Sequence, residues 1–353
     1  MPSVTGNIPV GAGRCVRLEA SIEPDRVSEV PGLAAEAERL GFDGLLFRET
    51  KHDPFAMLAL AAASTRRVRL GTAIVVAFAR SPTVVAHSAW DVQSLSGGRF
   101  ALGLGTQVRA HIERRFGMRW ESPLSRMREY ITALREVWRA WQTGRPPQFR
   151  GKHYRIDLTS WYFDPGPIEH PEIPVYVAAV NRGMCRLAGE LCDGVHVHPL
   201  NSPRYIREVM LPAIREGAER AGRRPEEVKL SATVFTAIGS DDEEVRRSEE
   251  LVRRMIAFYA STPAYRTILA LYGWERVGEE LSGLAREGKW DEMARLVDDE
   301  MMREFSVSGR PSRVAQEIVR RYRGLLESVS VSVPFDGRSS WWPELVRSFR
   351  SSL

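Results

Sequence analysis

The sequence predicts an α/β protein built as a (β/α)8 barrel with insertions. Short apolar, β-branched runs alternate with amphipathic helical segments along most of the 353 residues, and eight of these runs are predicted strands. The stretch 70–107 holds strand, helix and strand in direct succession, as in two parallel strands joined by a right-handed crossover. A doubly wound open sheet is the competing fold, but no GxGxxG turn follows the first strand. We expect one domain over residues 1–353.

The first half of the chain supplies four predicted strands with three helices between them. The strands are the runs 15–21, 45–48, 70–76 and 99–105, and the helices span 24–40, 55–65 and 82–95. Pro31 is expected to break or restart the first helix. Ser81-Pro82 predicts the start of the third, because serine caps free N–H groups and proline suits the first turn. The apolar stripe expected on that helix is Val84, Val85, Ala89, Val92 and Leu95.

The second half repeats the alternation, with longer interruptions. The predicted strands are 174–179, 193–198, 228–238 and 329–335, and the helices are 122–143, 182–191, 203–221, 241–259, 311–322 and 341–349. Helix 122–143 carries a long buried stripe, namely Met127, Ile131, Leu134, Val137, Trp138 and Trp141. Three segments fall outside the alternation and are interpreted as insertions on the barrel: 108–122 as a polar loop, 144–174 as a short hairpin or extended excursion, and 256–306 as irregular or helical.

Charge, cysteine content and hydropathy argue against several classes of function. The formal charge of +5 arises from 50 basic and 45 acidic residues and is dispersed, so we expect no nucleic-acid partner. The three cysteines, Cys15, Cys185 and Cys192, form no CxxC, which favours a reducing compartment and simple packing over disulfides or zinc. The N-terminus has neither a basic start nor an apolar run, and no apolar stretch reaches the ~18 residues of a membrane span. A cytoplasmic protein without a membrane partner is therefore expected.

Reactive groups of such a barrel lie where its strands end at their carboxyl side. After the second strand stand Glu49, Thr50 and His52. His52 is a candidate acid or base near neutral pH, and Glu49 could hold a proton or orient His52. The alternative is a loop histidine with only structural hydrogen bonds. The chain has no G-x-S-x-G turn and no cysteine at a strand end, so a bound organic cofactor fits better than covalent hydrolysis.

The turn after the fifth strand is a candidate phosphate seat. Ala178, Ala179 and Val180 are followed by Asn181-Arg182 at the start of a helix, whose free N–H groups attract anions. An ordinary strand-to-helix turn is the alternative. His196 and His198 point to one side of the sixth strand, but no third ligand has suitable spacing, so we predict pocket-lining or core histidines and no metal.

Four motifs resemble the bacterial luciferase-like monooxygenase superfamily. They are AEAERLGFDGLLFRE (35–49), LGTAIVV (70–76), SLSGGRFALGLGT (94–106) and RLAGELCDGV (186–195), within a resemblance that covers about residues 15–335. They are most similar to oxidoreductases that use the deazaflavin coenzyme F-420 (F420), with FMN as the alternative cofactor. The resemblance implies a luciferase-like TIM barrel, a soluble enzyme and a homodimer.

The resemblance also implies where the cofactor binds. It places a non-prolyl cis peptide at Ala73–Ile74, with the ring beside Thr72, Ala73, Ile74 and Val75. The phosphate arm would pass Gly105, Thr106 and Gln107, then Ala178, Ala179, Val180, Asn181 and Arg182, and the strand-six end at Gly194, Val195 and His196. Trp120, Trp161 and the 256–306 insertion either shape the substrate side or pack.

The chain departs from the family pattern at three places. Many relatives have histidine where Thr50 stands, an acidic residue where Gln93 stands, and glycines at the phosphate turn, where Ala178-Ala179-Val180 stand here. Donors from Asn181 and Arg182 are expected to compensate at that turn. The proton donor is therefore open among Glu49, Thr50 and His52. The implied function is hydride transfer between F420 and a small organic substrate. The alternatives are an FMN monooxygenase that uses O2 and a partner flavin reductase, or a cofactor-binding relative without catalytic activity.

Overall fold

The computed structural model describes residues 16–353, so Cys15 lies outside the described part. Its centre is a closed barrel of eight parallel strands, in which the last strand pairs back on the first. Around the barrel these strands are β1 (Arg17–Ile22), β2 (Gly44–Phe47), β3 (Arg69–Thr72), β5 (Phe100–Gly105), β8 (Val175–Ala179), β9 (Gly194–Val197), β10 (Lys229–Ile238) and β12 (Ser328–Val331). The predicted (β/α)8 barrel is confirmed.

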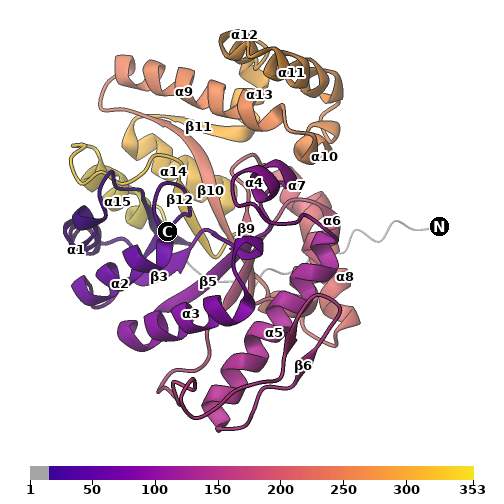
Figure 1. Cartoon of the computed structure of the whole chain (residues 1–353). Helices are drawn as coiled ribbons and strands as arrows, with labels where there is room; N and C mark the ends of the chain where they lie inside the picture. Colours follow the sequence, from indigo (N-terminus) through magenta and orange to yellow (C-terminus); the bar gives the residue numbers. More distant parts are fainter. Residues whose placement is uncertain (1–15) are drawn as a thin grey trace.

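Helices surround the barrel (Figure 1). They are α1 (Val30–Leu40), α2 (Pro54–Ser64), α3 (Pro82–Ser96), α5 (Pro123–Thr143), α6 (Arg182–Leu191), α8 (Leu211–Arg220), α14 (Pro311–Tyr322) and α15 (Trp342–Ser351). Ser81 caps α3 by accepting the N–H of Val84, as predicted, and all six predicted stripe residues of α5 are buried. Within residues 16–353, no helix combines the length and apolar character that crossing a bilayer requires.

The third strand of the barrel is interrupted where the resemblance implied a special backbone. β3 ends at Thr72 and β4 (Val75–Val76) resumes the pairing with β5, while the bond between Ala73 and Ile74 is cis. Gly71 pairs with Ala101 and Val75 pairs with Leu104, so β3 and β4 use one residue more than β5 over the same span. This is a bulge. Ala73 and Ile74 therefore have no paired residue in β5.

Several local predictions were wrong in detail. The predicted helix 24–40 is a 3-10 turn, η1 (Val27–Glu29), followed by α1, and Pro31 lies in the first turn of α1, where its missing N–H needs no partner, so of the two expected outcomes the helix restarts at Pro31. Val84 and Leu95 of α3 are 54% and 53% exposed, because residues eleven apart share a helix face, and that face is not the one that buries Val85, Ala89 and Val92. The predicted 203–221 helix contains a π-helical segment, Ile206–Met210, between α7 (Pro203–Tyr205) and α8.

The three insertions have more structure than the sequence indicated. Segment 108–122 contains α4 (Arg109–Arg114), and 144–174 contains the expected hairpin, β6 (Phe149–Arg150) with β7 (Arg155–Ile156). The third insertion follows α9 (Asp242–Ala260) and consists of short helices and a strand, namely η5 (Pro263–Tyr265), α10 (Arg266–Ala270), α11 (Glu275–Glu287), α12 (Trp290–Arg295), α13 (Asp299–Phe305) and β11 (Ser306–Gly309). β11 was not predicted; it pairs with the last residues of the long β10, and the insertion helices gather beside this end of β10 (Figure 1).

Candidate active site at the barrel mouth

The bulge between β3 and β4 is held from both neighbouring strands. The hydroxyl of Thr72 accepts the N–H of Gly103 at 2.7 Å and donates to its carbonyl at 2.8 Å, which replaces ladder bonds on the β5 side. On the β2 side, Ala73 donates its N–H to the Phe47 carbonyl, and Glu49 donates its N–H to the Ile74 carbonyl. Thr72 and Val75 are fully buried, whereas Ala73 and Ile74 remain partly accessible. The bulge is therefore a fixed apolar shelf at the mouth of the barrel.

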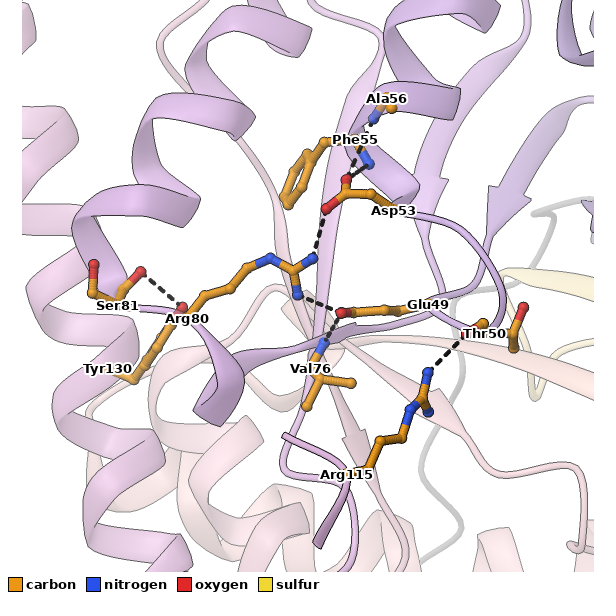
Figure 2. Close-up of polar contacts among 10 residues, drawn as sticks. All are labelled: Glu49, Thr50, Asp53, Phe55, Ala56, Val76, Arg80, Ser81, Arg115 and Tyr130. Carbon is orange, nitrogen blue, oxygen red and sulfur yellow. Dashed lines mark hydrogen bonds and ion pairs between the residues drawn. The ribbon is translucent and has the colours of Figure 1, made fainter. Parts of the chain in front are cut away.

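Glu49 is the centre of a polar network that supports this shelf (Figure 2). One carboxylate oxygen lies 2.5 Å from Arg80, and the other accepts the N–H of Val76 at 2.7 Å. Arg80 also binds Asp53 at 2.7 Å, and Asp53 caps α2 through the N–H groups of Phe55 and Ala56. Burial alone would lower the pKa of Arg80, but its hydrogen bonds to the two carboxylates raise it. The network joins β2, β4, α2 and the start of α3.

The three proton-donor candidates therefore have different surroundings. The Glu49 carboxylate is 8% exposed and both its oxygens accept hydrogen bonds, so it serves as an acceptor that supports the shelf. Thr50 is exposed and uses its carbonyl to accept from Arg115. His52 is partly buried, with Nε2 3.1 Å from the Asp25 carbonyl, and it lines a cavity of about 240 Å³. The structure places all three after β2, but only His52 has a titratable side chain in a cavity.

Other predicted cofactor residues meet at the shelf. A Cβ on Gly105 would lie 2.6 Å from Cδ1 of Ile74 and 3.6 Å from Cβ of Ala178, so glycine here lets three strands approach closely. The β5 end continues through Thr106 into Gln107, whose φ of 58° is a left-handed conformation uncommon outside glycine. Such backbone is typical of functional loops held by their surroundings.

The turn after β8 is open in the way a phosphate seat requires. Asn181 precedes α6, yet no side chain caps the helix. Instead, the Asn181 amide donates to the Ala264 carbonyl and accepts from Thr267, both in the insertion. The first N–H groups of α6 are thus left for an anion, and the exposed Arg182 adds positive charge. Val180 is partly accessible, whereas Ala179 is buried.

Three of the predicted cofactor residues lie elsewhere. Gly194 is the first residue of β9, and a Cβ there would lie 2.2 Å from the Tyr176 ring. Val195 is fully buried. His196 faces a second cavity of about 90 Å³ at the opposite end of the barrel, and burial lowers its pKa to about 4. The predicted strand 193–198 agrees with β9 to within one residue at each end, but the cofactor assignment took residues from its first three positions rather than from its carboxyl end.

His198 and Arg48 occupy the mouth instead. His198 stacks on Tyr265 at 4.3 Å and accepts the Leu200 N–H at Nδ1, so its neutral ring carries hydrogen on Nε2. Burial, with a smaller effect of Arg48, lowers the pKa of His198 to about 3. Arg48 follows β2, forms an ion pair with Glu23 at 2.8 Å and donates to Thr233 at 3.2 Å. Sequence analysis missed Arg48; an arginine at the end of a buried strand was the available signal.

Of the two tryptophans considered for the substrate side, only Trp120 lies near the mouth. Trp120 packs on Phe78, directly after β4, with ring centroids 5.9 Å apart. Trp161 is 87% exposed in the connection from α5 to β8. This connection joins the amino end of β8, so Trp161 does not line the mouth.

The two described cysteines, Cys185 and Cys192, are buried, and burial raises the pKa of both thiols to about 12, consistent with packing. Residues 16–353 contain no cluster of three or more potential metal ligands.

The chain belongs to the luciferase-like monooxygenase family, whose model matches residues 11–328. An uncharacterized protein of Mycobacterium tuberculosis is 43% identical over 91% of this chain and 94% of its own length. A putative coenzyme F420-dependent oxidoreductase of the same species is 31% identical over 81% of this chain and 85% of its own.

The fold agrees with solved structures. The coenzyme F420-dependent tetrahydromethanopterin reductase of Methanopyrus kandleri superposes with a TM-score of 0.76 at 22% identity, covering 96% of this chain and 98% of that one.

Proposed function

We propose that this protein is an F420-dependent oxidoreductase that transfers a hydride between the deazaflavin and a small organic substrate. The observation that carries the proposal is the accessible apolar shelf of Ala73 and Ile74, fixed at the barrel mouth by Thr72 and Glu49. A planar tricyclic ring needs such a rigid apolar support. The relative named a putative F420-dependent oxidoreductase supports the choice of cofactor.

The residues present fit the cofactor at both ends. The shelf offers a flat apolar contact to the ring, and the uncapped α6 N-terminus with Arg182 offers donors to the phosphate. When bound, F420 would supply or accept the hydride. Between the two ends, Gly105 and Ala178 leave room because neither has a side chain beyond Cβ. The donor set therefore matches an elongated molecule with an apolar head and an anionic arm.

The chain's own contribution is orientation and proton handling. Thr72 and the Glu49–Arg80 pair keep the shelf in one position, which fixes the angle at which substrate meets the ring. Trp120, Tyr259 of α9 and Tyr265 of the insertion exclude water from the mouth. We assign the acid–base role, that is, proton exchange with the substrate, to His52, because its imidazole lines the cavity at the mouth.

The test is a titration of the apo protein with F420 and, separately, with FMN, following cofactor fluorescence. Micromolar affinity for F420 and none for FMN is expected. Tight binding of FMN without binding of F420 would overturn the proposal and favour a monooxygenase that uses O2 and a partner flavin reductase. If F420 binds but is never oxidised or reduced with any substrate, the protein is a cofactor-binding relative without catalysis.

A further inference from the structure

The cavity of about 240 Å³ at the barrel mouth has charged or polar side chains at five of its eight lining residues. Its walls come from the segment after β1, the segment after β2, Met57 of α2 and Pro334 after β12. The lining residues are Glu23, Pro24, Arg48, Thr50, Lys51, His52, Met57 and Pro334. Three of these side chains are basic and one is acidic. The cavity is large enough for a group such as a carboxylate or phosphate with several carbon atoms attached.

The acidic side chain, Glu23, already forms an ion pair with Arg48. Glu23 Oε1 lies 2.8 Å from one terminal nitrogen of Arg48 and within 3.5 Å of the Ser21 hydroxyl. The second terminal nitrogen of Arg48 donates to Thr233, so these contacts use one N–H from each terminal nitrogen. A guanidinium presents five N–H donors in a fork that fits a carboxylate or phosphate. Arg48 therefore has donors beyond those its present partners use.

The other basic side chains of the cavity are held weakly by the protein. Lys51 pairs with Asp25 at 3.0 Å, but the two side chains are 71% and 86% exposed, so this pair contributes little and is readily exchanged. His52 contacts only the Asp25 carbonyl. Deeper in the mouth, His198 is neutral, since burial lowers its pKa to about 3. Arg48 is thus the permanent positive charge between the mouth and the cavity.

We propose that this cavity binds an anionic oxygen group of the substrate, a carboxylate or a phosphate, and that Glu23 holds Arg48 until the substrate displaces it. The proposal rests on the proposed function, because it assigns the substrate side of the same site. Arg48 would bind the anion, Lys51 would rotate from Asp25 toward it, and Glu23 would compete with it for Arg48. The substrate class is then an organic acid or phosphate ester rather than a neutral alcohol or ketone.

If Glu23 and the anion compete for Arg48, substitutions of these two residues should change anion affinity in opposite directions. In the F420-loaded protein, inorganic phosphate and acetate are titrated by calorimetry at constant ionic strength set with chloride. Arg48→Gln is expected to weaken binding of at least one of the two anions about tenfold or more. Glu23→Gln is expected to tighten it severalfold, because the competitor is removed. Arg48→Lys keeps the charge and should stay within a few-fold of the parent. The two anions distinguish a carboxylate from a phosphate preference.

Matched controls come from an exposed ion pair elsewhere. Arg276 and Glu280 lie 3.3 Å apart on α11 with side chains 90% and 48% exposed, and Arg276→Gln and Glu280→Gln make the same charge changes without touching the cavity. Both should leave anion affinity unchanged. Unchanged affinity in Arg48→Gln, or affinity that is not raised in Glu23→Gln, overturns the proposal. The F420 titration of each variant is read separately, so loss of cofactor binding would count against the proposed function and not against this cavity.

Discussion

The two ends of the barrel interior both hold charged groups, but they use them differently. At the amino end, Glu19 is 7% exposed and accepts from Ser231, while Arg17 and Tyr176 both bind Glu327 at 3.2 and 2.9 Å. At the carboxyl end, Arg48 and the α6 N-terminus retain N–H donors that no residue of 16–353 uses, and His52 makes one hydrogen bond, to the Asp25 carbonyl. The β9 histidines follow the same division: His196 faces the closed end and His198 the mouth.

The difference indicates that the charged groups at the amino end serve folding, whereas those at the mouth serve cofactor binding and turnover. At the amino end Arg17 pairs with Glu327 and Glu19 accepts from Ser231 beside a small cavity of about 90 Å³, although Nε of Arg17 is buried there without a hydrogen-bond partner among residues 16–353. Substitutions at this end should change folding and leave the chemistry alone. Charges at the mouth are arranged around an apolar shelf and a larger cavity, so substitutions there should change cofactor binding or turnover. Glu49 is the exception, since it supports the mouth by the same ion-pair chemistry that holds the amino end.

The largest expected effect is that of Glu49→Ala. This change leaves Arg80 with Asp53 alone and the Val76 N–H without its acceptor, which should cost about 3 kcal/mol of unfolding free energy. F420 affinity should fall at least tenfold in parallel. Denaturant unfolding and the fluorescence titration measure the two effects, with Glu36→Ala in the exposed Glu36–Arg39 pair as the control. Normal stability and cofactor affinity with lost turnover would make Glu49 a proton donor instead.

His52→Ala should separate chemistry from folding. Because His52 makes one hydrogen bond to a backbone carbonyl, unfolding should change little, whereas the rate of hydride transfer should fall roughly 10²-fold or more if the imidazole handles the proton. Stopped-flow oxidation of reduced F420 and denaturant unfolding together give the answer. A rate equal to that of the parent would exclude His52 from the chemistry.

Tyr176→Phe tests the amino end. The change removes the hydroxyl that donates to Glu327 and keeps the ring that packs on His196, so we expect a loss of about 1–2 kcal/mol in stability. F420 affinity and turnover should equal those of the parent. A variant with normal stability and impaired turnover would show that the two ends are coupled through the barrel interior.

Glu19→Gln should have the smallest effect and the opposite sign. Burial raises the pKa of Glu19 above 4.5, with hydrogen bonds from Ser328 and Ser231 and the charge of Arg17 opposing it. The stability associated with the protonated carboxyl is present below pH 4.5 and is lost as pH rises through the folded-state pKa. The glutamine variant should therefore be more stable than the parent at pH 7, by roughly 1 kcal/mol or about 1–2 °C in Tm, and equal to it near pH 4. Thermal scans at both pH values measure this difference.

Local signals in the sequence were sufficient for the barrel. Apolar runs, the Ser81 cap and the stripe of α5 act over a few residues, so the order of strands and helices could be predicted from neighbours in the chain. The position of the bulge came from the LGTAIVV motif and its resemblance to a family, and not from periodicity. Short-range rules were wrong where two helix faces compete, as for Val84, and where pairing involves a distant strand, as for β11.

The functional site depended on long-range contacts. Arg48 meets Thr233, 185 residues away, and Asn181 is drawn from its helix by Ala264 and Thr267, more than 80 residues away. Neither partner has a signal near the residue in the sequence, so Arg48 was missed and Asn181 was expected to donate to a phosphate. The sequence alone determined the barrel and the candidates at its strand ends. Only the tertiary structure decided which of them support the shelf and which face a cavity, because closing the barrel brings together side chains from strands far apart in the chain.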